Sequence, residues 1–279
     1  MAISSQDFNY IRNVVHEYSA VVLEPGKEYL VESRLQLLVH DEGATSIEDL
    51  LRRLRADLSG ELHRKVAEVM MTAETTFFRD VRPFETLKMV VLPELLERRA
   101  QDRSLNIWCA ASASGQEPYS IAMLLHDSFP LFAAWKVQFI ASDLSKTLLL
   151  RARKGSFTQL EVNRGLPAAL LVKYFHKNGS EWQIDARIRD MVDFREINLV
   201  KLWPCLPAMD IVFLRNVLIY FDMETRRNIL ARVARILKPD GFLFLGGSET
   251  GTQLEEIFEP IARDVNACFR LRRIESLPE

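Results

Sequence analysis

The sequence predicts an α/β protein in which an all-helical domain, residues 1–80, precedes a domain built on a mostly parallel β-sheet, residues 81–279. Residues 1–80 carry apolar side chains at helical spacing and almost no strand pattern. From Phe84 onward, short apolar runs alternate with amphipathic helical stretches. This alternation is typical of a parallel sheet with helices on both faces.

Four helices account for the first domain. Apolar residues recur at helical spacing over residues 8–18 and 31–39. Thr45 followed by Glu48 matches a capping box, which predicts the start of a third helix. A fourth helix is expected over residues 61–71.

The second domain opens with a helix over residues 84–99 and then alternates. The expected elements are, in order, strand 105–111, helix 117–129, strand 136–141, helix 145–153, strand 209–214, a helix capped by Asp222, and strands 242–245 and 267–271. Pro239-Asp240-Gly241 is expected to end the helix before the strand at 242.

The stretch between residues 155 and 195 interrupts this rhythm. Residues 166–175 favour a helix. Over residues 182–188 apolar and polar side chains alternate, as in a half-exposed antiparallel strand, and residues 191–194 are its expected partner. The pattern predicts a small antiparallel β-insertion at about residues 176–194.

The composition argues against several classes of protein. The net charge is −2, and residues 1–80 hold nine Lys and Arg against fourteen Asp and Glu, so the basic excess of a nucleic-acid binder is missing. No run of 18 apolar residues predicts a membrane span, and the N-terminus lacks a signal-peptide pattern. Cys109, Cys205 and Cys268 fit buried thiols in a reducing cytoplasm. The five histidines have no metal-ligand spacing, so no metal site is expected.

The most informative stretch is residues 105–123, where a buried strand, a small-residue turn and a helix follow one another. This order places backbone N–H groups and a helix N-terminus at the carboxyl end of the sheet, where nucleotide-type ligands bind. The turn is not Gly-x-Gly-x-x-Gly, and Glu117 would repel a pyrophosphate but suit a cationic or hydroxyl-rich ligand. From this stretch alone, an ordinary strand–helix turn is the alternative.

An acidic residue after the next strand favours a bound nucleoside. Asp143 follows strand 136–141, and its carboxylate can accept two hydrogen bonds from the ribose hydroxyls. It lies 28 residues after Gly115, more than the roughly 20 of dinucleotide sites. The sequence therefore favours an adenosine without phosphates, such as S-adenosylmethionine, over NAD. A nicotinamide oxidoreductase is the weaker alternative, because the glycine fingerprint is absent.

Six motifs together resemble the chemotaxis receptor methyltransferases, the CheR family. Each residue taken alone also has a purely structural explanation: Arg79 fits a surface ion pair, Tyr220 a core aromatic residue and Asn198 a turn residue. The motifs are Thr-x-x-Thr-x-Phe-Phe-Arg-Asp (72–80), Gly-Gln-Glu-Pro-Tyr-Ser (115–120), Ala-Ser-Asp (141–143), Asn-Leu (198–199), Arg-Asn-Val-Leu-Ile-Tyr-Phe (215–221) and Lys-Pro-Asp-Gly-Phe-Leu-Phe-Leu-Gly-Gly-Ser-Glu (238–249).

The resemblance implies a Rossmann-like methyltransferase domain that uses S-adenosylmethionine and releases S-adenosylhomocysteine. Its substrates would be glutamate side chains on the cytoplasmic helical domain of bacterial chemoreceptors. Arg79 and Tyr220 match residues implicated in catalysis. The positions that match cofactor contacts are Thr75, Arg79, Glu117, Asp143, Asn198, Leu199, Arg215 and Asn216. We expect a cytoplasmic monomer without a metal.

The chain departs from the family pattern in its first domain. Ala73 stands where the family usually has Asn, so one side-chain contact with the cofactor is expected to be missing. The helix near residues 31–39 carries only Arg34, where receptor-docking members often carry several arginines, and we expect Arg34 to meet an acidic receptor surface. The β-insertion could bind the receptor's C-terminal tail by edge pairing, but its shortness favours recognition without that tail.

Two other functions stay open. A methyltransferase acting on another substrate keeps every argument about the cofactor and loses only the receptor. A non-catalytic regulator would bind the nucleoside and a partner protein, and the presence of both Arg79 and Tyr220 argues against it.

Overall fold

The computed structural model describes residues 3–249, 252–261 and 268–272. Its packing divides the chain into two compact units. The first comprises the chain up to Ala73 together with Leu199–Lys201 and Tyr220–Arg226, and the second comprises Glu74–Asn198, Leu202–Ile219 and the chain from Arg227.

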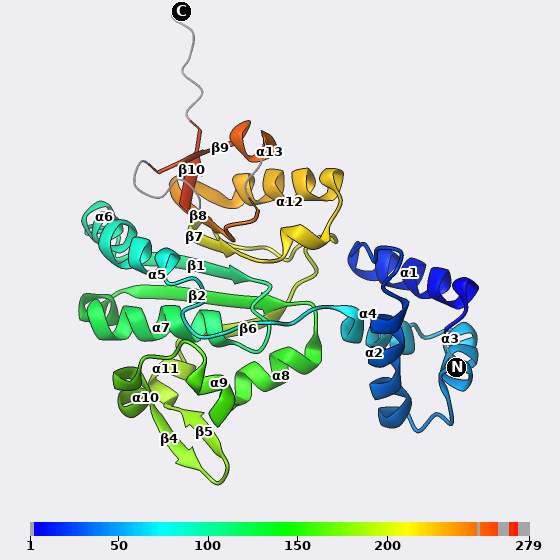
Figure 1. Cartoon of the computed structure of the whole chain (residues 1–279). Coiled ribbons are helices and arrows are strands. Elements are labelled where there is room, and N and C mark those ends of the chain that lie inside the picture. The colour runs from blue at the N-terminus through cyan, green and yellow to red at the C-terminus, as the bar shows by residue number, and fades with distance from the viewer. Residues whose placement is uncertain (1–2, 250–251, 262–267, 273–279) are drawn as a thin grey trace, which may run out of the picture. The chain divides into compact units, whose positions relative to one another are not determined.

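The first unit is helical, as the sequence predicts (Figure 1). The four helices of its N-terminal part are α1 Ser5–Ser19, α2 Glu28–Asp41, α3 Ile47–Ala56 and α4 Glu61–Met70. The cap of α3 lies one residue later than expected: Ser46, not Thr45, accepts a hydrogen bond from the Asp49 amide. The Asp49 carboxylate accepts a hydrogen bond from the Thr45 amide at 3.1 Å. Asp49 thus reaches back to the residues before the helix, the role that the expected capping box gives to Glu48.

Apolar residues from α1 and α4 close the core of this unit. Phe8, Ile11 and Val15 are buried on α1, and Val66 and Met70 on α4. The spacing of three and four residues places each set on one helix face.

Arg34 has partners within this unit. Its guanidinium donates to the Met70 carbonyl and, at 3.1 Å, to the Thr72 hydroxyl. Burial lowers the pKa of Arg34, an effect that Tyr220 partly offsets. The side chain thus holds the end of α4 and the chain that follows it.

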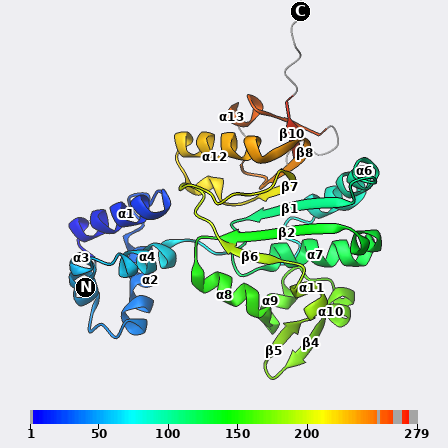
Figure 2. The same cartoon turned by 180° about the vertical axis from the view of Figure 1, so that it is seen from behind.

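The second unit contains a seven-stranded sheet within the described residues, in the order β6-β2-β1-β7-β8-β10-β9. The strands lie side by side in Figures 1 and 2, with α7 next to β2 and α12 next to β7 and β8. The first five strands in that order are parallel, and β10 and β9 are antiparallel to their neighbours. The bounds are β1 Ser104–Ala110, β2 Lys136–Asp143, β6 Asp193–Glu196, β7 Met209–Leu214, β8 Leu237–Leu245, β9 Phe258–Pro260 and β10 Cys268–Leu271.

The structure corrects the expected pairing of the β-insertion. Residues 193–196 form β6, which pairs parallel to β2 in the large sheet rather than with the strand near Trp182. The small antiparallel sheet is instead β3-β5-β4, with β3 Ser156–Thr158, β4 Phe175–Asn178 and β5 Glu181–Ile184. The expected strand at 182–188 also ends early, because Asp185 caps a short helix, α11 Ala186–Arg189.

Leu237 already belongs to β8, so Pro239-Asp240-Gly241 lies within a strand and does not end the preceding helix as expected.

Helices cover the second unit between its strands, largely where the sequence predicts them. The remaining elements are α5 Arg82–Thr86, a π-helical turn Leu87–Val91, α6 Leu92–Arg98, α7 Gln116–Ser128, a 3-10 turn Pro130–Ala134, α8 Lys146–Lys154, α9 Gln159–Asn163, α10 Ala168–Tyr174, a 3-10 turn Leu218–Tyr220, α12 Met223–Ile236 and α13 Thr252–Glu255.

Aromatic and aliphatic side chains fill the core between the large sheet and its helices. The rings of Phe213 and Phe244, on neighbouring strands, stack with centroids 4.3 Å apart, and Phe84 packs on Phe213. The helix expected over residues 84–99 passes through the π-helical turn just before Pro93. A proline ring clashes with the carbonyl one turn earlier, and the wider turn accommodates it.

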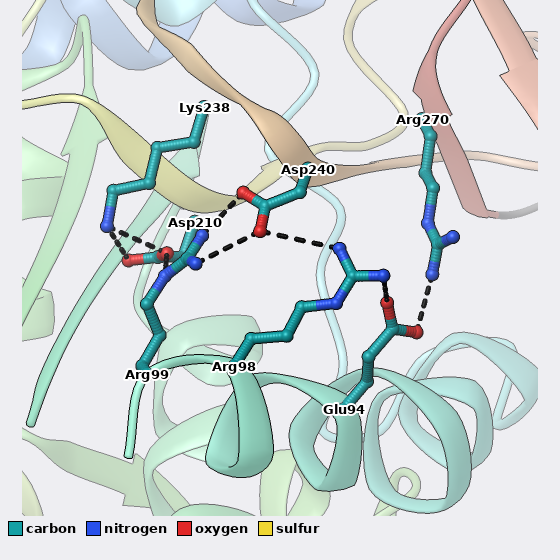
Figure 3. A network of polar contacts seen from close by, with 7 residues as sticks. All are labelled: Glu94, Arg98, Arg99, Asp210, Lys238, Asp240 and Arg270. Carbon is teal, nitrogen blue, oxygen red and sulfur yellow. Dashed lines mark hydrogen bonds and ion pairs between the residues drawn. The ribbon is translucent and has the colours of Figure 1, made fainter. Parts of the chain in front are cut away.

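A charged network joins α6 to the amino ends of β7 and β8 (Figure 3). Asp210 is fully buried, and its carboxylate accepts hydrogen bonds from Arg99 at 2.8 Å, from Lys238 at 2.9 Å and from the Asn106 amide at 2.8 Å. Asp240 also accepts from Arg99, which lowers the pKa of its carboxyl group. Because two cations and a backbone N–H surround Asp210, its charge is compensated inside the protein.

The network continues to the antiparallel edge of the sheet. Glu94 on α6 pairs with Arg98 at 2.6 Å and with Arg270 on β10 at 2.5 Å. Figure 3 shows the Glu94 carboxylate between the two guanidinium groups. The same helix is therefore tied to the parallel and to the antiparallel part of the sheet.

We expect Asp210→Ala to lower the free energy of unfolding by about 3–5 kcal/mol, because Arg99 and Lys238 would lose their buried counter-charge. Urea unfolding measures the change. Asp190→Ala is the matched control, since the Asp190 side chain is 69% exposed in its ion pair with Arg189. Equal stability of the two variants would contradict a structural role for the network.

Candidate active site

The carboxyl ends of the parallel strands meet at one edge of the large sheet. Ala110 at the end of β1 pairs with Ser142 and Leu214, and Leu214 pairs with Leu245. Four loops therefore start side by side: residues 111–115, the residues after Asp143, the residues after Leu214 and the residues after Leu245. Ligands of open parallel sheets bind at this edge.

The turn after β1 has an unusual backbone. Ala111 and Ala113 adopt positive φ values of 55° and 47°, and Gly115 adopts 97°. A side chain on Gly115 would also press on Ala152 and on the Tyr119 ring, each 3.1 Å from an added Cβ atom. Left-handed alanines are strained, so other contacts must hold this turn in place.

Asp143 supplies those contacts. Its carboxylate accepts hydrogen bonds from the Ala113 amide at 2.8 Å and from the Ser145 amide at 2.9 Å. The backbone carbonyl of Asp143 accepts from the Ile197 amide at 3.2 Å, just before Asn198. The structure thus brings Asp143, the turn after β1 and the Asn198 segment to one place.

Arg215 is the central charge of the site. Its side chain is 1% exposed and donates to the Glu117 carboxylate, to the Asp80 carboxylate at 2.7 Å and to the Arg79 carbonyl at 3.1 Å. Phe84 lies under the guanidinium, 5.8 Å from ring centroid to Cζ. A buried guanidinium needs such acceptors, and it here connects three segments distant in sequence.

The segment that carries Arg79 is strained. Phe78, Asp80 and Val81 have positive φ values of 48°, 67° and 46°, an uncommon conformation for a β-branched residue such as Val81. The Phe78 amide donates to Ser120 at 3.0 Å, and the Arg79 guanidinium donates to the Glu74 carbonyl at 2.7 Å. Strained backbone held by several contacts is a feature of functional sites.

A buried thiol lies beside the charged pair. Cys109 is fully buried and donates to Glu117 at 3.3 Å. Cys268 is also buried, whereas Cys205 is exposed, contrary to the expectation of buried thiols. Burial, and then the Glu117 charge, raise the pKa of the Cys109 thiol. Cys109 therefore stays protonated and does not serve as a nucleophile.

The residues at this edge fit a nucleoside. The buried carboxylates of Asp143 and Glu117 are hydrogen-bond acceptors, which suit hydroxyl or amino groups. The Ser112 hydroxyl in the turn is buried and has no hydrogen-bond partner among the described residues. Within those residues no group of three or more His, Cys, Asp and Glu could hold a metal ion, and no helix is long and apolar enough to cross a membrane.

Four further residues predicted for the site are Thr75, Asn216, Leu199 and Tyr220. Thr75 is half-buried four residues before Arg79, and Asn216 has a left-handed backbone with φ 57°. Leu199 and Tyr220 belong to the first compact unit, where the Tyr220 carbonyl accepts from the Val22 amide at 3.0 Å.

Two further residues lie at this edge, and the sequence motifs alone indicate no role for either of them. Asp80 is an anionic partner of Arg215, and Glu249 accepts hydrogen bonds from the backbone after β7. Both lie inside the quoted motifs, at the end of 72–80 and of 238–249. Their partners are far away in sequence, so the motifs marked the positions without showing the contacts.

Two family models match the chain. Residues 73–266 match "CheR methyltransferase, SAM binding domain", and residues 6–70 match "CheR methyltransferase, all-alpha domain". Together they cover most of the sequence.

Curated relatives match over nearly the full length. Chemotaxis protein methyltransferase 1 of Pseudomonas aeruginosa is 39% identical over 98% of this chain and 100% of its own length. Chemotaxis protein methyltransferase Cher2 of Pseudomonas putida is 38% identical over 94% and 96%. The chemotaxis protein methyltransferase of Vibrio parahaemolyticus is 35% identical over 98% and 99%.

Solved structures add nothing to this assignment. PKMT2 from Rickettsia typhi in complex with AdoHcy aligns with 63% of this chain and 26% of its own at 17% identity, with a TM-score of 0.38.

We expect Asp143→Ala to weaken the binding of S-adenosylhomocysteine about 10- to 100-fold, the factor for losing hydrogen bonds to a charged group. Calorimetry measures it, with Asp193→Ala, a 54% exposed carboxylate on β6, as the control. Because Asp143 also holds the turn, its loss could weaken binding indirectly. A double-mutant cycle separates the two effects: the affinities of wild type and variant are also measured for a ligand analogue without the ribose hydroxyls. Equal penalties for the analogue in wild type and variant would contradict a ribose contact.

Proposed function

Because the chain belongs to the CheR methyltransferase family, we propose that it transfers the methyl group of S-adenosylmethionine to glutamate side chains of chemoreceptors. The chain is an S-adenosylmethionine-dependent methyltransferase of the chemotaxis type. One structural observation supports the site assignment best: the strained turn after β1 is held by Asp143, and the buried Arg215–Glu117 pair lies at the same edge.

The residues that we assign to the cofactor include residues at the carboxyl edge of the sheet and further positions taken from the motif match. We propose that Asp143 accepts from the ribose, and that Glu117 and the backbone N–H groups of the turn face the polar parts of the ligand. The assigned set is completed by Thr75, Arg79, Asn198, Leu199, Arg215 and Asn216. When bound, the cofactor supplies an electrophilic methyl group on a positively charged sulfur.

The substrate carboxylate needs no general base. A glutamate has a reference pKa of about 4.3, so it is ionised at neutral pH. The reaction brings a carboxylate and a cation together and cancels their charges, and a site that excludes water favours such a loss of charge. The protein's main task is alignment of the reacting groups, which can contribute roughly 7–11 kcal/mol to lowering the barrier.

Two residues are proposed to orient the substrate. The Arg79 guanidinium would hold one carboxylate oxygen, and the Tyr220 hydroxyl would orient the carboxylate or the methyl group. Both assignments rest on the motif match. The hydrogen bonds that fix the backbone around Arg79 support a defined position for its side chain.

The reaction itself is tested by adding labelled S-adenosylmethionine to receptor-containing membranes. We expect incorporation of label that is released as methanol in mild base, because carboxyl methyl esters hydrolyse and N-methyl groups do not. Label that resists base would indicate another methylated group. Binding of the cofactor without incorporation into any protein would favour the non-catalytic regulator.

Tyr220→Phe should retain cofactor affinity and slow methyl transfer by up to about tenfold, since one orienting hydrogen bond of about 0.5–1.5 kcal/mol is lost. Calorimetry and single-turnover rates measure the two quantities. Tyr29→Phe is the control, because the Tyr29 side chain lies 71% exposed on α2. A wild-type rate in Tyr220→Phe would remove Tyr220 from catalysis.

Recognition of the receptor is proposed not to need its C-terminal tail. The small sheet offers β4 as an edge strand, but β4 is only Phe175–Asn178. The bonds of Arg34 to Met70 and Thr72 give Arg34 a structural role beside the expected docking role. A charge reversal at Arg34 is therefore no clean test of docking.

We expect a receptor that lacks its last few residues to be methylated nearly as fast as the complete receptor. Methylation rates at low receptor concentration measure the effect. A large decrease would instead place recognition at the edge of the small sheet, where peptide strands can pair.

A further inference from the structure

Among the residues that the structure describes, main-chain N–H groups are the hydrogen-bond donors to the Glu249 carboxylate. Its Oε2 atom accepts from the amides of Asn216 at 2.6 Å and Gly246 at 2.7 Å. Its Oε1 atom accepts from the amides of Val217 and Leu218, both at 2.7 Å. A carboxylate can accept about four hydrogen bonds, so these four N–H donors occupy its acceptor sites. Successive N–H groups that converge on one anion form a backbone nest.

The turn after β8 is shaped around this contact. The Glu249 amide donates to the Gly246 carbonyl at 2.9 Å, which folds the carboxylate back over the turn. A Cβ atom added to Gly246 would lie 2.7 Å from the Glu249 Oε2 atom and 2.7 Å from the Asn216 Nδ2 atom. One added to Gly247 would meet nothing within 4 Å. Only the first of the two adjacent glycines is thus required by packing.

The nest belongs to the loop that carries Arg215 and Asn216. Asn216 is held in a left-handed conformation, with φ 57°, and a non-glycine residue adopts it at a cost unless other contacts compensate. Arg215 comes directly before it and bonds Glu117 and Asp80 with its side chain. Glu249 therefore fixes by its charge the backbone from which both predicted cofactor residues project.

We propose that Glu249 is a positioning residue for methyl transfer: it is an internal anion that orders residues 215–218 so that Arg215 and Asn216 meet the cofactor. This inference rests on the proposed function. Glu249 acts through the backbone and contacts neither substrate nor cofactor. Its loss should leave an empty anion-binding nest in a loop that is otherwise complete.

The test compares full-length Glu249→Ala with wild type. We expect the Kd for S-adenosylhomocysteine to rise about tenfold or more, the factor for losing charge-assisted hydrogen bonds, with a parallel rise in the KM for S-adenosylmethionine. Acetate or formate should restore affinity in a saturable way, because a small carboxylate can enter the nest. Chloride at the same ionic strength should not.

Glu249→Gln supplies the matched variant. The amide has nearly the same shape but turns an N–H₂ donor toward backbone N–H groups, so we expect a similar loss that acetate cannot restore. Gly246→Ala should weaken binding in the same direction, and Gly247→Ala should bind like wild type. The glycine pair keeps the test decisive if Glu249→Ala fails to fold.

Two results would overturn the proposal. One is wild-type affinity in Glu249→Ala or Gly246→Ala. The other is a loss in Glu249→Ala that neither acetate nor formate reverses, which would leave only a contribution to stability. A wild-type protein that binds S-adenosylhomocysteine but methylates no receptor would instead contradict the proposed function and leave the binding comparison valid.

Discussion

The buried guanidinium of Arg215 is the interaction on which the candidate site depends. An arginine cannot give up its proton in a protein, so a side chain that is 1% exposed must meet anions or carbonyls. Glu117 at the start of α7, Asp80 and the Arg79 carbonyl meet this requirement. One charge thus fixes the end of β7, the start of α7 and the segment that carries Arg79. Glu117 and Arg79 lie 98 and 136 positions before Arg215 along the chain.

Strained backbone surrounds this charge, and hydrogen bonds with charged side chains hold that backbone in place. The turn after β1 and the segment 78–81 contain non-glycine residues with positive φ, each costing about 1–3 kcal/mol. Asp143 compensates in the first segment, Arg215 in the second and Glu249 at Asn216. These contacts are made between groups of the protein itself, and alignment rather than acid–base chemistry is what the proposed reaction needs.

The two ends of the parallel strands have different tasks. At the amino ends, Asp210, Arg99 and Lys238 compensate one another and tie α6 to the sheet. At the carboxyl ends, Asp143 holds the turn after β1 and Glu117 pairs with Arg215. The same kinds of charged residue therefore stabilise the fold at one end and, in our proposal, bind the nucleoside at the other.

The sequence by itself determined the helices of the first domain, the strands at 104–110, 136–143 and 209–214, and the family, because helical spacing, apolar runs and motifs are local properties. Only the tertiary structure decided that residues 193–196 join β2 in the large sheet, since a short strand of alternating residues does not specify its partner. That pairing is what carries Asn198 to the carboxyl edge. The Arg215–Asp80 and Glu249–Asn216 contacts likewise join residues separated by 135 and 33 positions, and no local pattern encodes such distances.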